Sequence, residues 1–167
     1  SGDRTNITGS LNGAIIYNSG TGNVTNNAVE ISGGVFGGTI RAGYTNGTGS
    51  ANYNSVTISG GTFGSSIYGG YSVSGDAIGN VINISGGTFE PASGWTSFDI
   101  IAGYGADNKT VSDNEINLYG NVNLEKVQLF GSSGGSSGQV LNNVLNVKFT
   151  NQSNAKIKSI NNFNVIN

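Results

Sequence analysis

A repeated block of apolar residues, glycines and asparagine constrains the fold of this chain more than any other feature. Three full copies span 27–44 (NAVEISGGVFGGTIRAGY), 54–71 (NSVTISGGTFGSSIYGGY) and 80–104 (NVINISGGTF…DIIAGY), spaced by 27 and then 26 residues. Weaker copies lie at 114–131 and 143–149, a partial copy ends in Ile15-Ile16-Tyr17, and an incomplete one lies near 163–166. Such a period is typical of solenoids, in which each unit buries its apolar stripe by stacking on the next one.

Apolar and polar residues alternate within each copy, as in Val29-Glu30-Ile31. Residues two apart lie on one face of a strand, so this pattern favours a strand over a helix. The inward positions are Val29, Val56, Ile82, Ile116 and Leu145, then Ile31, Ile58, Ile84, Leu118 and Val147. The outward positions between them are Glu30, Thr57, Asn83, Asn117 and Asn146. Stacked in register, each inward residue would meet its own copy about 4.8 Å away.

Each of these strands in the full copies leads to a corner and then to a second strand. The corner is Ser-Gly-Gly, which suits a positive φ, and a phenylalanine follows it. The phenylalanines are Phe36, Phe63 and Phe89, and the inward residues of the second strand are Ile40, Ile67, Ile100 and, by looser alignment, Leu129. We expect Gly43, Gly70 and Gly103 to turn the chain after this strand, and Tyr44, Tyr71 and Tyr104 to close each unit.

An asparagine stands four residues before the anchor position in each of five copies: Asn27, Asn54, Asn80, Asn114 and Asn143. Stacked side-chain amides can donate to and accept from the next coil, and such a ladder would satisfy polar groups at a tight corner. The alternative is that asparagine only tolerates a left-handed backbone at this turn. Both interpretations are structural.

Composition excludes several function classes. The chain has 29 Gly and 25 Asn among 167 residues, yet only 10% of its residues are charged, so a regular repeat is favoured over disorder. The absence of Cys and His removes thiolate ligands, disulfides and every mechanism that depends on histidine. The net charge of −2 gives no basic surface for nucleic acid, and no apolar run reaches the roughly 20 residues of a membrane span.

The stretch 58–72, with its order I-S-G-G-T-F…I-Y-G-G-Y-S, resembles repeats in the passenger regions of bacterial autotransporters and related large surface adhesins. The resemblance covers roughly residues 27–149. It implies a right-handed β-helical rod that is secreted across a Gram-negative outer membrane and displayed at the cell surface, and it carries no shared catalytic residues. The chain is therefore expected to be all-β, with one domain over 1–167: a right-handed parallel β-helix (β-solenoid) of about five coils of 26–27 residues, anchored through other parts of a longer protein.

The candidate binding residues are aromatic. The third copy carries seven extra residues between Phe89 and Ile100, which include Trp95 and the single proline, Pro91. Insertions in solenoids emerge as loops on one face, often the binding face, although a tryptophan there can also plug its own loop. Tyr17, Tyr68 and Phe130 are placed in one outward column, together with Arg41 and Ile101, where rings could stack on sugars or anchor a protein. The alternative is that these rings pack against neighbouring coils or a covering loop, which we expect for Tyr44, Tyr71 and Tyr104.

Carboxylates are the only acid–base groups to consider. Asp76, Asp107 and Asp113 fall in corresponding loops of neighbouring coils, and Lys109 and Arg41 could supply cations. Clusters of this kind serve polysaccharide-degrading β-helix enzymes. Solvated loop charge is the simpler interpretation, because the three aspartates do not share a column and no calcium-repeat pattern occurs. We expect no cofactor and no metal.

The sequence thus predicts a structural and adhesive segment, not an enzyme. Its expected partners are a host-surface or matrix protein or a glycan, with self-association also considered, and no nucleic acid. The alternative is a lyase or hydrolase of polysaccharides, which would require three or more charged side chains to converge in a groove.

Overall fold

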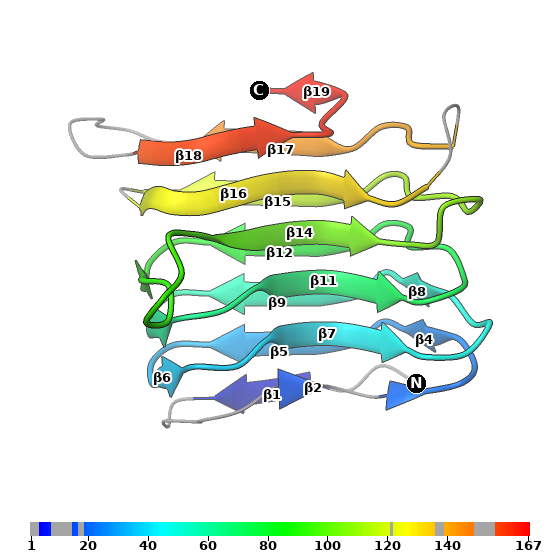
Figure 1. Ribbon diagram of the computed structural model, residues 1–167, viewed down its shortest axis with the longest axis horizontal. Coiled ribbons are helices and arrows are strands. Elements are labelled where there is room, and N and C mark those ends of the chain that lie inside the picture. The colour runs from blue at the N-terminus through cyan, green and yellow to red at the C-terminus, as the bar shows by residue number, and fades with distance from the viewer. Residues whose placement is uncertain (1–3, 8–14, 17–18, 121, 136–138, 149–155) are drawn as a thin grey trace.

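The computed structural model is a stack of parallel β-strand coils, about five in number, and it describes residues 4–7, 15–16, 19–120, 122–135, 139–148 and 156–167. Every secondary-structure element in this described part is a strand. Figure 1 shows the coils lying one above another from the N-terminal to the C-terminal end. The expected all-β solenoid is confirmed. The described part contains no helix that is long and apolar enough to cross a membrane.

Four parallel sheets are formed by strands of successive coils, and sheets A and C run along the whole stack while sheets B and D are shorter. Sheet A contains β1 (Arg4–Ile7), β5 (Ala28–Ile31), β9 (Ser55–Ile58), β12 (Val81–Ile84), β15 (Glu115–Tyr119), β17 (Val144–Lys148) and β19 (Val165–Ile166). Sheet B contains β6 (Val35–Phe36), β10 (Thr62–Phe63) and β13 (Thr88–Phe89). Sheet C contains β2 (Ile15–Ile16), β3 (Ser19–Gly20), β7 (Ile40–Thr45), β11 (Ile67–Ser72), β14 (Phe98–Tyr104), β16 (Asn123–Ser133) and β18 (Lys156–Asn161). Sheet D contains β4 (Val24–Thr25) and β8 (Ala51–Asn52).

The register of the strands is the one that the repeat predicts. Val29 pairs with Val56, Val56 with Ile82, and the same column continues through Ile116 to Leu145. The anchor column pairs in the same way from Ile31 to Val147. A one-residue slip would move every apolar side chain to the solvent face, so burial on one face fixes this register.

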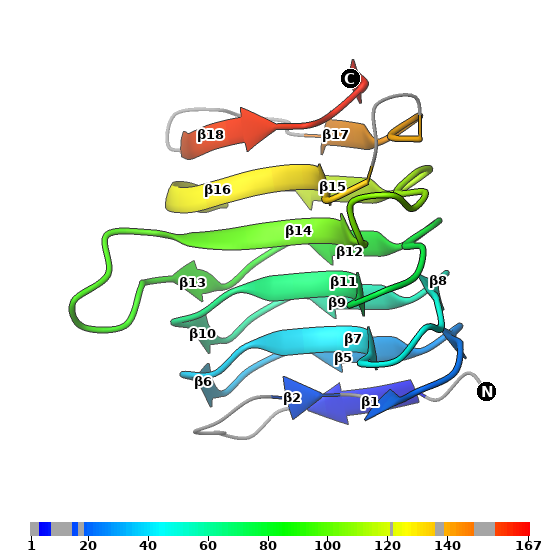
Figure 2. The same cartoon turned by 45° about the vertical axis from the view of Figure 1, so that its right-hand side comes forward.

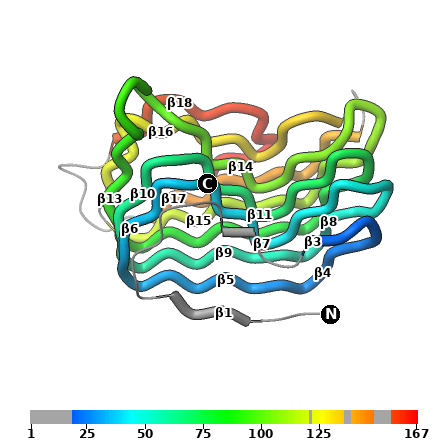
Figure 3. The backbone as a smooth tube through the Cα atoms, turned by 60° about the horizontal axis from the view of Figure 1, so that its bottom comes forward, coloured from blue at the N-terminus to red at the C-terminus, as the bar shows by residue number. Residues whose placement is uncertain are grey.

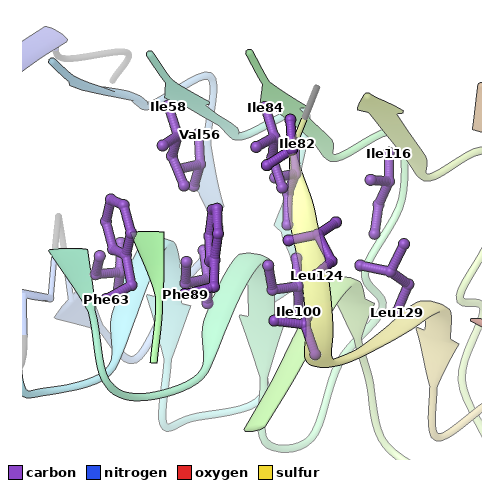
Figure 4. Packing of buried hydrophobic residues seen from close by; sticks show 14 of the residues in the cluster. Val56, Ile58, Phe63, Ile82, Ile84, Phe89, Ile100, Ile116, Leu124 and Leu129 are labelled. Carbon is purple, nitrogen blue, oxygen red and sulfur yellow. The ribbon is translucent and has the colours of Figure 1, made fainter. Parts of the chain in front are cut away.

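The core is a narrow slot between sheet A and the facing sheets B and C. Figure 4 shows Val56, Ile58, Ile82 and Ile84 on one side of the slot, pointing toward Phe63, Phe89 and Ile100 on the other. The rings of Phe36, Phe63 and Phe89 stack along the axis with centroids 5.3 and 5.2 Å apart. At the Ser-Gly-Gly corners, the second glycine has a φ of 100 to 106° in the three full copies (Gly34, Gly61, Gly87), as predicted.

The asparagine column forms a buried ladder between sheets D and A. Each side-chain amide donates to the Oδ1 atom of the next asparagine, at 2.7 Å from Asn27 to Asn54 and 3.1 Å from Asn54 to Asn80. The ladder continues through Asn114 to Asn143, and each amide from Asn54 onward also donates to a backbone carbonyl of the preceding coil. At this corner the left-handed backbone belongs to the residue before each ladder asparagine: Asn26, Tyr53, Gly79, Asp113 and Asn142. The ladder interpretation is therefore correct, and the alternative is wrong.

The glycines expected to turn the chain have a different role. Gly43, Gly70 and Gly103 lie inside β7, β11 and β14, so the expected turn is wrong. A Cβ atom on Gly43 would lie 2.5 Å from Nδ2 of Asn54, and one on Gly103 would lie 2.5 Å from Nδ2 of Asn114. Glycine is needed here because the asparagine ladder fills the slot on the opposite side.

The first coil corrects the expected placement of Tyr17. Ile15 pairs with Ile40, and Ile16 pairs with Arg41, so Ile16 occupies the position that was assigned to Tyr17. Tyr17 itself lies outside the described residues. Two adjacent isoleucines give no alternation from which the register could be read, which explains the error of one residue.

Candidate functional site

The insertion between β13 and β14 is the main departure from the regular coil. Figure 2 shows it leaving the stack as a long loop beside β13 and β10. Its first residues still pair with the coil below, because the Glu90 amide donates to the carbonyl of Phe63 and the Ala92 amide donates to that of Gly64. Figure 3 shows the same segment rising above the neighbouring coils on the side where β13 and β10 lie.

A tight turn presents Trp95 at the tip of this loop. The Trp95 amide donates to the carbonyl of Ala92 at 3.0 Å, and Gly94, the third residue of the turn, has a φ of 93°. Glycine at this position is what a type II turn requires. The indole is 74% exposed, so Trp95 does not plug its own loop.

A groove of about 660 Å³ lies between this loop and the stack. Its walls are the insertion and the starts of the second strands in the neighbouring coils: residues 37, 39, 64–66, 92, 94–99 and Gln128. The groove therefore spans four successive coils. Its volume falls in the range of small-molecule sites, roughly 300–1,000 Å³.

Polar side chains form one column along the groove. Thr39, Ser66, Asp99 and Gln128 each stand one residue before the buried aliphatic residue of sheet C, so they point outward. Neighbouring polar groups are linked: Gln128 Nε2 donates to Asp99 Oδ1 at 3.1 Å, and the Asp99 amide donates to Ser66 Oγ at 3.5 Å. These bonds hold the column in place while hydroxyl groups and carboxylate lone pairs remain for a ligand.

Charge at the groove is close to balanced. Asp99 contributes a carboxylate, and Lys158 reaches the rim, where its ammonium donates to Ser97 Oγ at 2.7 Å. Glu90 and Lys126 form an exposed ion pair beside the loop, and the hydrogen bond to Glu90 raises the pKa of Lys126. Neither sign of charge dominates the groove.

An aromatic cluster of Tyr44, Tyr68, Tyr71 and Tyr104, with Arg41 against its rings, lies on the outer face of sheet C next to the groove. Tyr71 and Tyr104 stack with centroids 4.2 Å apart, and the Arg41 guanidinium lies 4.8 Å from the centre of the Tyr71 ring and 5.3 Å from that of Tyr68. Burial raises the pKa of Tyr68, Arg41 opposes the rise, and Asp99 adds to it. Burial and the neighbouring Tyr104 raise the pKa of Tyr71 to about 12. The rings of this cluster contact one another, so their faces are largely occupied.

The structure separates the candidate binding residues. Trp95 lines the groove, whereas Tyr68 and Phe130 are half-buried on the outward face of sheet C, two residues beyond the groove residues Ser66 and Gln128. Tyr44, Tyr71 and Tyr104 pack against one another across neighbouring coils on the outer face of sheet C, as expected. The prediction missed Asp99 and Gln128. Their signal was present, because both occupy the outward position just before the aliphatic residue of the second strand.

Two of the loop aspartates, Asp76 and Asp113, accept hydrogen bonds from the coil that follows them. Asp76 accepts from the Thr110 amide at 2.9 Å, and Asp113 accepts from Ser112 and Asn142 at 2.8 and 3.0 Å. Among the described residues, no three acidic side chains are grouped so that they could hold a metal ion. These hydrogen bonds connect the loop of each aspartate to the next coil and so stabilise the stack.

No family model, no curated protein and no solved structure matches this chain. Function is therefore inferred from the repeat and from the groove.

Proposed function

We propose that this chain is a structural and adhesive segment of a secreted bacterial cell-surface protein of the autotransporter type. The regular coils form a stiff rod, and the insertion presents a contact site on one side of it. The observation that carries the proposal is the exposed Trp95, on a hydrogen-bonded turn beside a groove of about 660 Å³, in a coil whose neighbours lack this loop. Large exposed aromatic residues in such positions commonly anchor partners.

The rod suits a display role for a physical reason. The strands of each coil pair only with those of its neighbours, so the stack can be extended without changing its cross-section, and each added coil adds about 4.8 Å. Few charges and many side-chain amides keep its surface polar, and the outer face of sheet A carries a second amide column. The partner in this proposal is a host-surface or matrix protein or a glycan.

An adhesion assay tests the proposal. Beads coated with the purified chain would be applied to cultured epithelial cells and to surfaces coated with matrix proteins or glycans. We expect retention on at least one of these surfaces, and loss of retention for Trp95→Ala. Equal retention of the wild type and of Trp95→Ala on every surface, with both proteins folded, would contradict the proposal.

The polysaccharide-degrading alternative makes a different prediction. Incubation of the chain with polysaccharides would release shorter products, detectable as new reducing or unsaturated ends. The adhesive proposal predicts no such products.

A further inference from the structure

The exposed indole restricts what the groove can bind. The bond from the Trp95 amide to the carbonyl of Ala92 fixes the backbone of the turn, and the exposed side chain presents a flat apolar face beside the groove. A matching ligand needs a flat apolar face of its own. The C–H face of a pyranose ring has this property, while the hydroxyl groups of the same ring project toward its edge.

The polar column restricts the ligand further. Thr39, Ser66, Asp99 and Gln128 place a hydroxyl, a second hydroxyl, a carboxylate and an amide at successive coils, about 4.8 Å apart. An extended chain of linked pyranose rings advances by a similar length per ring. Hydroxyls of successive rings would therefore meet successive polar groups along the rod axis.

The charged groups at the groove favour neutral sugars over acidic ones. An acidic sugar in the groove would bring its carboxylate close to Asp99, and such like-charge contact is unfavourable. The ammonium of Lys158 is engaged at the rim by Ser97. Neutral hydroxyl groups can donate to Asp99 and accept from Gln128 without any penalty of this kind.

We infer that the groove beside Trp95 binds a neutral oligosaccharide that lies along the rod axis, with one ring stacked on the indole and the next rings hydrogen-bonded to Ser66, Asp99 and Gln128. This inference rests on the proposed function and gives its partner a chemical class.

Calorimetric titration of the purified chain tests it. The neutral probes are cello-, malto-, laminari- and chito-oligosaccharides, and oligogalacturonate is the acidic probe. We expect at least one neutral probe to bind, with an affinity that stays constant as salt is raised, because no net charge is neutralised. Binding of oligogalacturonate alone, or failure of every neutral probe, would overturn the inference.

Two variants address the site by different routes. Trp95→Ala removes the stacking face and is expected to lower the affinity about tenfold or more. Gly37→Leu narrows the groove in the first of its four coils, at a position where a Cβ would have no atom within 4 Å and where φ is not positive, so it should fold normally and lower the affinity. Unchanged affinity in either folded variant would contradict the placement of the ligand.

The matched control is Tyr53→Asn. Tyr53 is 60% exposed and follows β8, which lies on the opposite side of the stack from the insertion (Figure 2). Its φ is 56°, and Asn26 and Asn142 hold the same left-handed position in other coils, so asparagine fits there. Sugar binding should be unchanged in this variant, and a loss equal to that of Trp95→Ala would contradict the assignment.

The two proposals fail separately. If coated beads adhere through Trp95 while no neutral oligosaccharide binds, the sugar inference is wrong and the adhesive function stands. If neither adhesion nor sugar binding occurs, both are wrong.

Discussion

Asn80 and Trp95 belong to the same coil but obey different constraints. Asn80 is fully buried, and its side chain accepts from the amide and Nδ2 of Asn54 and donates to Ala51 and Asn114. Trp95 is 74% exposed on a loop that the neighbouring coils lack. A residue that recurs in every coil is fixed by the coils above and below it. A residue that occurs in one coil alone does not have to stack on a copy of itself, so it can contact a binding partner instead.

Removing one rung of the ladder should have the largest effect on stability. Asn80→Ala removes the acceptor of the Asn54 backbone amide and of one N–H of the Asn54 side chain, and it removes the donor to the carbonyl of Ala51. Each buried group left unsatisfied costs roughly 1–3 kcal/mol. We expect the free energy of unfolding, measured by urea denaturation, to fall by about 3 kcal/mol or more. Asn83→Ala, in the outer amide column, is the control and should cost less than about 1 kcal/mol. Equal losses in the two variants would remove the distinction between interior and surface amides.

The glycine that faces the ladder should be the next most sensitive position. In Gly70→Ala, the new methyl group would lie 2.6 Å from the carbonyl oxygen of Ala51, which is backbone and cannot move aside easily. Overpacking of this kind costs about 1–3 kcal/mol. Gly37→Ala, where nothing lies within 4 Å, should be neutral or slightly stabilising in the same urea titration. A neutral Gly70→Ala would refute the close approach of strand and ladder.

The tyrosine cluster repeats along the rod but lies on its outside, so its effect should be intermediate and visible only at alkaline pH. The pKa of Tyr71 is raised to about 12, whereas an unfolded tyrosine has a pKa of about 10. The folded state therefore holds this proton more tightly, and the contribution of Tyr71 to stability should be constant below pH ~10 and fall between pH ~10 and ~12. Denaturation across this range, with phenolate absorbance as a second signal, measures the fall. Tyr71→Phe should reduce it, and an identical fall in that variant would assign the pH effect elsewhere.

The insertion should matter least for stability. Trp95→Ala changes an exposed side chain that the core does not use, so the free energy of unfolding should stay within about 0.5 kcal/mol of the wild type. A loss above about 2 kcal/mol would show that the loop supports the stack, and the contrast between the two regions would then fail.

The sequence predicted those parts of the fold that repeat. Recurrence at a fixed spacing gave the strands, their parallel register and the amide ladder, because stacking applies one constraint to every copy of a residue. It did not reveal why Gly43 and Gly70 are glycines, since that reason lies across the slot in the ladder. It also missed the register of the first coil by one residue, because adjacent isoleucines leave no alternation to follow.

The candidate site was predicted less completely. The insertion and Trp95 could be recognised because they break the repeat, but burial or exposure of the indole depends on the turn at 92–95. Asp99 and Gln128 line the groove only because the loop folds back beside the strands of sheet C. That direction is set by backbone bonds to the coil below, which local sequence does not encode.

The in-register stack is the central claim, and paired cysteines test it most directly. The chain has no cysteine of its own, and Thr57 and Asn83 are register partners on the outward face of sheet A. A disulfide needs Cα atoms about 4.4–6.8 Å apart, and parallel partners lie about 4.8 Å apart, so Thr57→Cys with Asn83→Cys should oxidise within one molecule. Mass spectrometry should detect this bond in dilute protein and not in Thr57→Cys with Val81→Cys, which is two residues out of register. Formation of the second bond without the first would contradict the stack.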